Sequence, residues 1–186
     1  SKRTGKGTFT WPDGRVYEGD FVDGKRTGKG TYKSDSYAYE GDFVDGKITG
    51  KGTETFFDGA VYEGDFVDGK RTGKGTFTWP EGDVYEGDWV NDRRTGKGTE
   101  TFFDYGVYEG DFVDGKRTGK GTFTYANGHV YEGDWVNDKR TKGTETLANG
   151  DVYEGDFVDG KRTGKGTFTW TDGDVYEGDF VNGEAT

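Results

Sequence analysis

The sequence repeats itself at an interval of 22 or 23 residues along its length. Each interval opens with the tetrapeptide Tyr-Glu-Gly-Asp, which begins at Tyr17, Tyr39, Tyr62, Tyr85, Tyr108, Tyr131, Tyr153 and Tyr176. In repeat proteins each unit contacts mainly its neighbours, so stability is close to one-dimensional. We therefore expect a single repeat array over residues 1–186.

Two short stretches within each unit alternate between apolar and polar residues. In the unit that begins at Val61, these stretches are residues 61–67 and 73–79, bounded by the turn residues Asp68-Gly69 on one side and Pro80-Glu81-Gly82 on the other. Alternating β-branched and aromatic residues between Gly-containing turns are typical of a β-hairpin, and frequent Gly disfavours helix. The sequence predicts an all-β fold: an elongated, twisted, single-layer antiparallel sheet of about eight hairpins and about 16 strands.

Composition separates an ordered array from a disordered chain. A hydrophobic content of 28% and a charged content of 33% would be compatible with disorder. The chain also carries 14 Phe, 12 Tyr and 5 Trp, and its 36 Gly recur periodically. These features indicate an ordered core of aromatic rings packed over glycines.

Charge and cysteine content limit the classes of partner and chemistry. A formal net charge of -11 disfavours nucleic acid, which binds through Lys and Arg, and makes an anionic membrane a weaker alternative. The chain has no Cys, which excludes a disulfide framework and thiolate chemistry. No apolar run is long enough to span a bilayer, and no signal peptide is visible, so we expect a cytoplasmic location.

The combination Y-E-G-D-[FW]-V-[DN]-[GD]…G-K-G-T, as at residues 62–76, resembles the MORN repeat (membrane occupation and recognition nexus) along essentially the whole chain. The resemblance implies a twisted sheet with a groove. It also implies a scaffold or protein-binding role, with suspected lipid binding and membrane or cytoskeleton association. The copies are unusually alike, and the chain begins with Ser1 and has no Met, which fits a consensus, engineered or excised array.

Strand parity places the rings on one face of the sheet. Tyr62, Gly64 and Phe66 share a face, as do Phe77 and Trp79, whereas Glu, Asp, Lys and Thr form a solvated opposite face with cross-strand charge pairs. Most rings should be core, and a single layer leaves part of them open as a candidate partner groove. The aromatic residues assigned to this groove are Trp11, Tyr17, Phe21, Tyr62, Phe66, Phe77, Trp79, Tyr85, Trp89, Tyr108, Phe112, Tyr131, Trp135, Tyr153, Phe157 and Trp170.

A carboxylate replaces the ring of Phe77 in three other copies, at Glu54, Glu100 and Glu145. A bare buried carboxylate is costly, so we expect these side chains to be partly exposed or paired with Lys or Arg. A local twist could turn them outward. They could instead form an acidic line that favours a basic, amphipathic peptide, or the alternation could carry no function.

Two further features support other functions. The turns carry basic pairs that could form a lipid-contacting stripe: Lys25, Arg26, Lys70, Arg71, Lys116, Arg117, Lys161 and Arg162. The terminal half-units lack polar caps, which predicts edge-to-edge or head-to-tail self-association. The chain is therefore a non-catalytic protein-binding scaffold, a membrane-associated (phosphoinositide) scaffold, or a structural array without a ligand.

Catalytic and cofactor motifs are not supported. Gly-Lys-Gly-Thr, as at residues 73–76, lacks the spacing and the helix of a phosphate loop. His129 is the only His and follows Asn127-Gly128 in a turn. Paired acids such as Glu63 and Asp65 recur in every copy and lack calcium-loop spacing. The sequence predicts no catalytic residue, no metal ligand and no cofactor.

Overall fold

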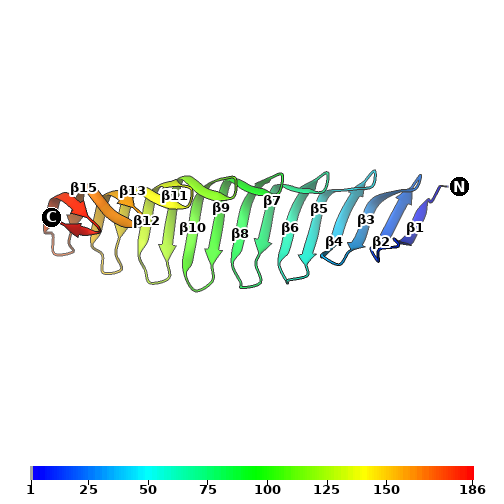
Figure 1. The fold of residues 1–186 in the computed structure, drawn as a ribbon, viewed down its shortest axis with the longest axis horizontal. Coiled ribbons are helices and arrows are strands. Elements are labelled where there is room, and N and C mark those ends of the chain that lie inside the picture. The colour runs from blue at the N-terminus through cyan, green and yellow to red at the C-terminus, as the bar shows by residue number, and fades with distance from the viewer. Residues whose placement is uncertain (1) are drawn as a thin grey trace. The chain divides into compact units, whose positions relative to one another are not determined.

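The computed structural model describes residues 2–186, whose regular structure consists entirely of β-strands (Figure 1). The chain divides into two compact units, Ser1–Arg93 and Arg94–Thr186. In the described residues no helix is long and apolar enough to cross a membrane.

The strands of the first unit follow one another as successive hairpins. They are β1 (Gly5–Thr10), β2 (Val16–Val22), β3 (Lys25–Lys33), β4 (Tyr37–Val44), β5 (Lys47–Phe56), β6 (Val61–Val67), β7 (Lys70–Thr78) and β8 (Val84–Val90).

The second unit has the same organisation. Its strands are β9 (Arg93–Phe102), β10 (Gly106–Val113), β11 (Lys116–Tyr125), β12 (Val130–Val136), β13 (Lys139–Thr146), β14 (Val152–Val158), β15 (Lys161–Thr169), β16 (Val175–Val181) and β17 (Glu184–Ala185).

Within each unit every strand pairs antiparallel with the strands next to it in the sequence. The prediction of all-β hairpin repeats in a single layer is confirmed. The prediction of about 16 strands misses the two-residue strand β17. The first stretch of the unit, residues 61–67, is strand β6, whereas the second strand, β7, begins at Lys70, three residues earlier than predicted.

The tight turn explains why β7 begins early. Asp68 and Gly69 both have positive φ, 51° and 83°, which a type I′ turn requires. This turn matches the strand twist, so pairing continues up to it and Val67 lies opposite Lys70. A register shift between Gly64 and Phe66 accommodates the extra residues as a β-bulge.

The core of each hairpin is a tyrosine ring that lies over two glycines. Tyr62 is fully buried, and its hydroxyl donates a hydrogen bond to the carbonyl of Asp65 at 3.0 Å. Gly64 and Gly75 face each other in the register. A Cβ added at Gly75 would lie 2.5 Å from the Tyr62 Cε2, so only glycine admits the ring at this distance from the backbone.

Within each unit the tyrosine rings also join one hairpin to the next. The rings of Tyr39 and Phe66 meet edge to face, with centroids 5.2 Å apart and an interplanar angle of 85°. The pair Tyr131 and Phe157 has almost the same geometry, at 5.3 Å and 89°. Such T-shaped contacts add to the burial of apolar area, so they hold successive hairpins together.

The glycine contact predicts that Gly30→Ala destabilises the fold whereas Gly7→Ala does not. A Cβ at Gly30 would lie 2.6 Å from the Tyr17 Cε2, which overpacks the core, whereas a Cβ at Gly7 approaches Phe21 only to 3.7 Å. We expect a loss of about 2 kcal/mol for Gly30→Ala and under about 0.5 kcal/mol for Gly7→Ala in urea unfolding. Equal losses for the two variants would contradict the ring-over-glycine packing.

Burial of the tyrosines predicts a loss of stability in alkali. Burial raises the pKa of Tyr39, Tyr108 and Tyr131 to about 12, whereas a tyrosine in an unfolded chain titrates near pH 10. Above about pH 10 the unfolded chain releases protons that the folded chain retains. The contribution of these tyrosines to the free energy of unfolding is therefore fully present below about pH 10 and is lost as the pH rises towards about 12. Urea unfolding as a function of pH measures this fall, and a flat profile above about pH 10 would contradict it.

Candidate functional site

The aromatic face has an inner row of closed rings. This row consists of the tyrosine that begins each unit and the Phe or Trp four residues later. The predicted groove residues that lie in it are buried and serve as core. They are Tyr17, Phe21, Tyr62, Phe66, Tyr85, Trp89, Tyr108, Phe112, Tyr131, Trp135, Tyr153 and Phe157.

An outer row of rings remains partly open. Of the predicted groove residues, Trp11, Phe77 and Trp79 are half-buried, and Trp170 is exposed. The residues predicted from the sequence leave out other rings of this row, among them Tyr105, Tyr125, Tyr37 and Phe56. Tyr105 is 58% exposed and stands in a turn where the equivalent position of another copy is Gly59, a replacement that could have identified it. The open part of the aromatic face is therefore at the outer ends of the hairpins.

Arginines from the second position of the strands after the tight turns lie on the aromatic face, and we call them the arginine row. In the first unit they include Arg26 and Arg71. The Arg71 Cζ lies 5.0 Å from the ring centroid of Trp89 and 5.6 Å from that of Tyr62. The aliphatic stem covers apolar rings and the guanidinium makes cation–π contacts, so these arginines complete the aromatic core.

Only one residue of each predicted basic pair is exposed at the turns, because the arginine of the pair belongs to the arginine row. Arg26, Arg71, Arg117 and Arg162 are half-buried on the aromatic face. Their lysine neighbours Lys25, Lys70, Lys116 and Lys161 are exposed. Contact of these turns with lipid stays a prediction, and the lysines carry it.

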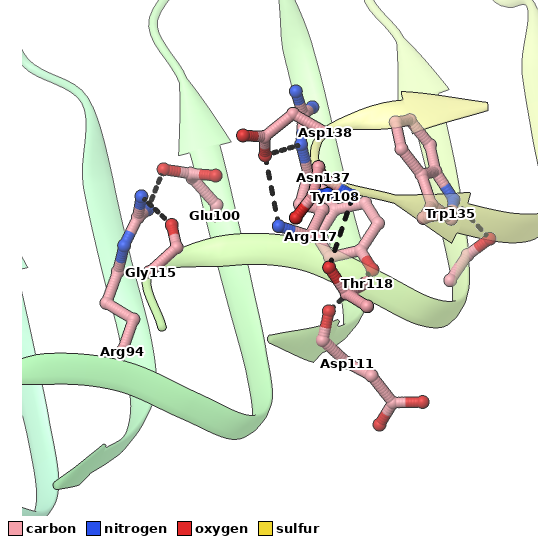
Figure 2. A network of polar contacts seen from close by, with 11 residues as sticks. Arg94, Glu100, Tyr108, Asp111, Gly115, Arg117, Thr118, Trp135, Asn137 and Asp138 are labelled. Carbon is pink, nitrogen blue, oxygen red and sulfur yellow. Dashed lines mark hydrogen bonds and ion pairs between the residues drawn. The ribbon is translucent and has the colours of Figure 1, made fainter. Parts of the chain in front are cut away.

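Two of the three replacing glutamates form ion pairs with the arginine row. Glu100 is 7% exposed and pairs with Arg94 (Figure 2). Glu145 pairs with the Arg140 Nη1 at 2.9 Å and with the Arg162 Nη2 at 2.8 Å. The expectation that these carboxylates are partly exposed or paired with Arg agrees with this geometry.

Glu54 differs from Glu100 and Glu145. It is half-buried and makes no ion pair among the described residues. Burial raises the pKa of its carboxyl, and Arg71 only partly opposes that shift. The Arg71 Nε instead lies 3.3 Å from the Asp92 Oδ1, in the same way that Arg117 pairs with Asp138 in Figure 2.

An open cavity of about 400 Å³ lies on the aromatic face of the second unit. Its walls include the rings of Tyr105, Phe123, Tyr125 and Trp135 and the guanidinium groups of Arg117 and Arg140. Ligand sites are typically concave and apolar with a few placed polar groups. This cavity has that character, and its size suits one or two side chains of a partner.

The opposite face is a ladder of cross-strand charge pairs, as predicted. In the first unit the Lys51 Nζ lies 3.0 Å from the Asp65 Oδ1, and the Lys74 Nζ lies 2.7 Å from the Asp88 Oδ1. In the second unit Lys120 and Asp134 are 2.7 Å apart. Exposed pairs of this kind add little stability and keep the face solvated. Among residues 2–186 no group of three His, Cys, Asp or Glu side chains is placed to hold a metal ion.

Comparison with known families matches the chain along its length. A model described as "MORN repeat" matches residues 1–14, 17–37, 39–61, 62–84, 85–107, 108–130, 131–152, 153–175 and 176–185. From residue 17 on, the matched segments begin at the same tyrosines as the repeats in the sequence.

Individual known proteins resemble this chain too weakly to indicate a function. No curated protein gives a significant match. Two solved structures of virginiamycin B lyase from Staphylococcus aureus are 14% identical, cover 95% of this chain and 70% of theirs, and have TM-scores of 0.19 and 0.18. A streptogramin B lyase structure is also 14% identical, covers 95% of this chain and 69% of its own, and has a TM-score of 0.16. Such scores carry no argument for a shared fold or activity.

The buried ion pair predicts that Arg94→Ile is strongly destabilising. Removing Arg94 leaves the Glu100 carboxylate buried without a counter-charge, which costs about 3 kcal/mol in the free energy of unfolding. The double variant Arg94→Ile with Glu100→Gln should recover much of this loss, because no charge remains buried. Urea unfolding of the three variants measures the coupling, and strictly additive losses would contradict it.

Proposed function

Because the chain belongs to the MORN repeat family along its whole length, we propose that it is a non-catalytic protein-binding scaffold whose aromatic face takes up a peptide segment of a partner. The observation that carries this proposal is the open cavity between Tyr105, Tyr125 and the arginine row. Tyrosine and arginine are the residue types that contribute most to protein interfaces, because they combine apolar area with placed polar groups.

The charges around the cavity favour an apolar or aromatic anchor on the partner. Arg117 pairs with Asp138 at 3.1 Å, and Lys139 pairs with Asp159 at 2.8 Å. The rim is therefore polar but electrically compensated, while the rings of Tyr105 and Tyr125 supply the apolar surface. An apolar side chain that covers these rings would release water from them without breaking an ion pair.

The acidic line of Glu54, Glu100 and Glu145 gives little support to a basic partner, because internal arginines neutralise two of its three carboxylates. Arg94 neutralises Glu100, and Arg140 and Arg162 neutralise Glu145. Reversing these two charges would break internal ion pairs, so a loss of binding in such a variant would not report on the partner. Attraction of a cation to this line depends on Glu54 alone.

Self-association is a second candidate function, because each terminal strand leaves an edge unpaired. In the described residues β1 pairs only with β2, and β17 covers only Phe180 and Val181 of the outer edge of β16. An open strand edge is a template for another strand. Light scattering across a wide concentration range tests this, and a constant monomeric mass would reject it.

Tyr105→Ala and Tyr125→Ala should each weaken peptide binding about tenfold, because they remove the apolar wall of the cavity. The peptides would come from a displayed library panned against this protein at physiological salt, and affinities would be measured by calorimetry. Val136→Thr is the matched control, because strand parity places Val136 on the opposite face, where it is exposed. No enrichment, or equal losses in all three variants, would reject the proposal.

A further inference from the structure

From β3 to β15 the arginine row has one gap, at Ile48 in the first unit; beyond it, the short terminal strand β17 carries Ala185 at the equivalent position. The segment Lys47-Ile48-Thr49-Gly50 of β5 corresponds to Arg93-Arg94-Thr95-Gly96 of β9 and to Lys70-Arg71-Thr72-Gly73 of β7. The backbone at the gap is unchanged. Gly69 N donates to the Ile48 carbonyl at 2.8 Å, as Gly115 N donates to that of Arg94 at 2.9 Å.

A filled position shows what surrounds the guanidinium group. The side chain of Arg94 reaches toward both Glu100 and Gly115 in Figure 2. It pairs with the Glu100 carboxylate, and its Nη2 donates to the Gly115 carbonyl at 2.7 Å. Its Cζ lies 5.3 Å from the ring centroid of Phe112.

Arg140 repeats this arrangement in another hairpin. Its Nη1 donates to Glu145 at 2.9 Å and its Nη2 to the Gly160 carbonyl at 2.9 Å. Its Cζ lies 5.0 Å from the Phe157 ring centroid. A carboxylate, a turn carbonyl and an aromatic ring therefore surround the guanidinium at both positions.

The same set of groups is present at the gap without its guanidinium. Glu54 occupies the position of Glu100, Gly69 that of Gly115 and Phe66 that of Phe112. Ile48 supplies the apolar cover that an arginine stem would give, since Phe66 remains 3% exposed. The hairpin therefore lacks only the guanidinium group that an arginine at position 48 would provide.

Among residues 2–186 no cation forms an ion pair with Glu54, and Arg71 compensates its charge only in part. Arg71 is the nearest candidate, and its Nε lies 3.3 Å from Asp92. Glu54 is half-buried, and so are Tyr37 and Phe56. Phe56 lies two residues beyond Glu54 on the same face, and Tyr37 lies opposite Phe56. A half-buried carboxylate beside two partly open rings favours a cation that can stack as well as donate hydrogen bonds.

We propose that Glu54, the Gly69 carbonyl and the rings of Tyr37 and Phe56 form a receptor site for the guanidinium group of an arginine side chain from a partner polypeptide. The planar guanidinium donates to two acceptors in a fixed fork geometry while its face stacks on a ring, and an ammonium group has neither the fork nor the planar face. The site lies in residues 1–93, apart from the cavity lined by Tyr105 and Tyr125, so neither proposal depends on the other.

The test is an NMR titration of the full chain with N-acetyl-arginine amide at low ionic strength, following the Glu54 carboxyl and the Tyr37 and Phe56 rings. We expect saturable shifts in the millimolar range, and a loss of affinity of at least about tenfold in Glu54→Gln. Glu63→Gln is the matched control, because Glu63 is exposed on the opposite face, and it should bind like the parent chain.

Two further controls, one variant of the chain and one uncharged ligand, make the titration decisive. Ile48→Arg should abolish the response, because the chain then supplies its own guanidinium. The capped citrulline amide, an uncharged counterpart, should give no saturable shift. Equal binding of citrulline or of capped lysine amide, an unchanged response in Ile48→Arg, or no saturable response to arginine would overturn the proposal.

The Ile48→Arg variant also gives a readout without any ligand. If the gap accepts a guanidinium, this variant should lower the pKa of the Glu54 carboxyl and raise the thermal unfolding temperature. An unchanged Glu54 pKa would show that the geometry at the gap does not accept the group and would overturn the proposal. Failure of peptide panning at the Tyr105 cavity would leave both readouts unaffected.

Discussion

The packing of a tyrosine ring on a pair of glycines determines most of what this chain can do. Tyr62 is fully buried although no second sheet covers it, because Gly64 and Gly75 let the ring lie directly on the backbone. The ring then presents its other surfaces to Phe66 of its own hairpin and to Trp89 of the next. One residue thus closes its hairpin and fixes the position of its neighbour.

A single-layer sheet has to cover its apolar face from within, and here arginine side chains provide the cover. Their stems pack on the rings, and their guanidinium groups end at turn carbonyls and carboxylates, as Arg140 does at Gly160 and Glu145. This cover depends on the identity of one residue in each hairpin. A change in that residue or in a neighbouring turn therefore alters the aromatic face: at Ile48 it loses a guanidinium group while the apolar cover remains, and around Tyr105 it opens into a cavity.

Much of the fold could be predicted from the sequence, because the period of two within strands and the Asp68-Gly69 turn are local signals. Parity alone placed Tyr62 and Phe77 on one face, and the register pairs them. The arginines were harder to place. The Arg71 Nε reaches Asp92, 21 residues away, through a long flexible side chain whose direction no local pattern encodes. The basic pairs therefore suggested an exposed stripe, while half of each pair lies on the rings.

The contacts of each tyrosine end at the next hairpin, and this has a consequence for how such genes change. Removing or duplicating one whole unit would join Tyr39 or Tyr62 to an equivalent ring in an equivalent position. Unequal recombination between units can therefore alter the length of the array without disturbing any retained core contact. The number of units can therefore change by whole hairpins, while a change inside one hairpin, as at Ile48, alters only the local surface of the aromatic face.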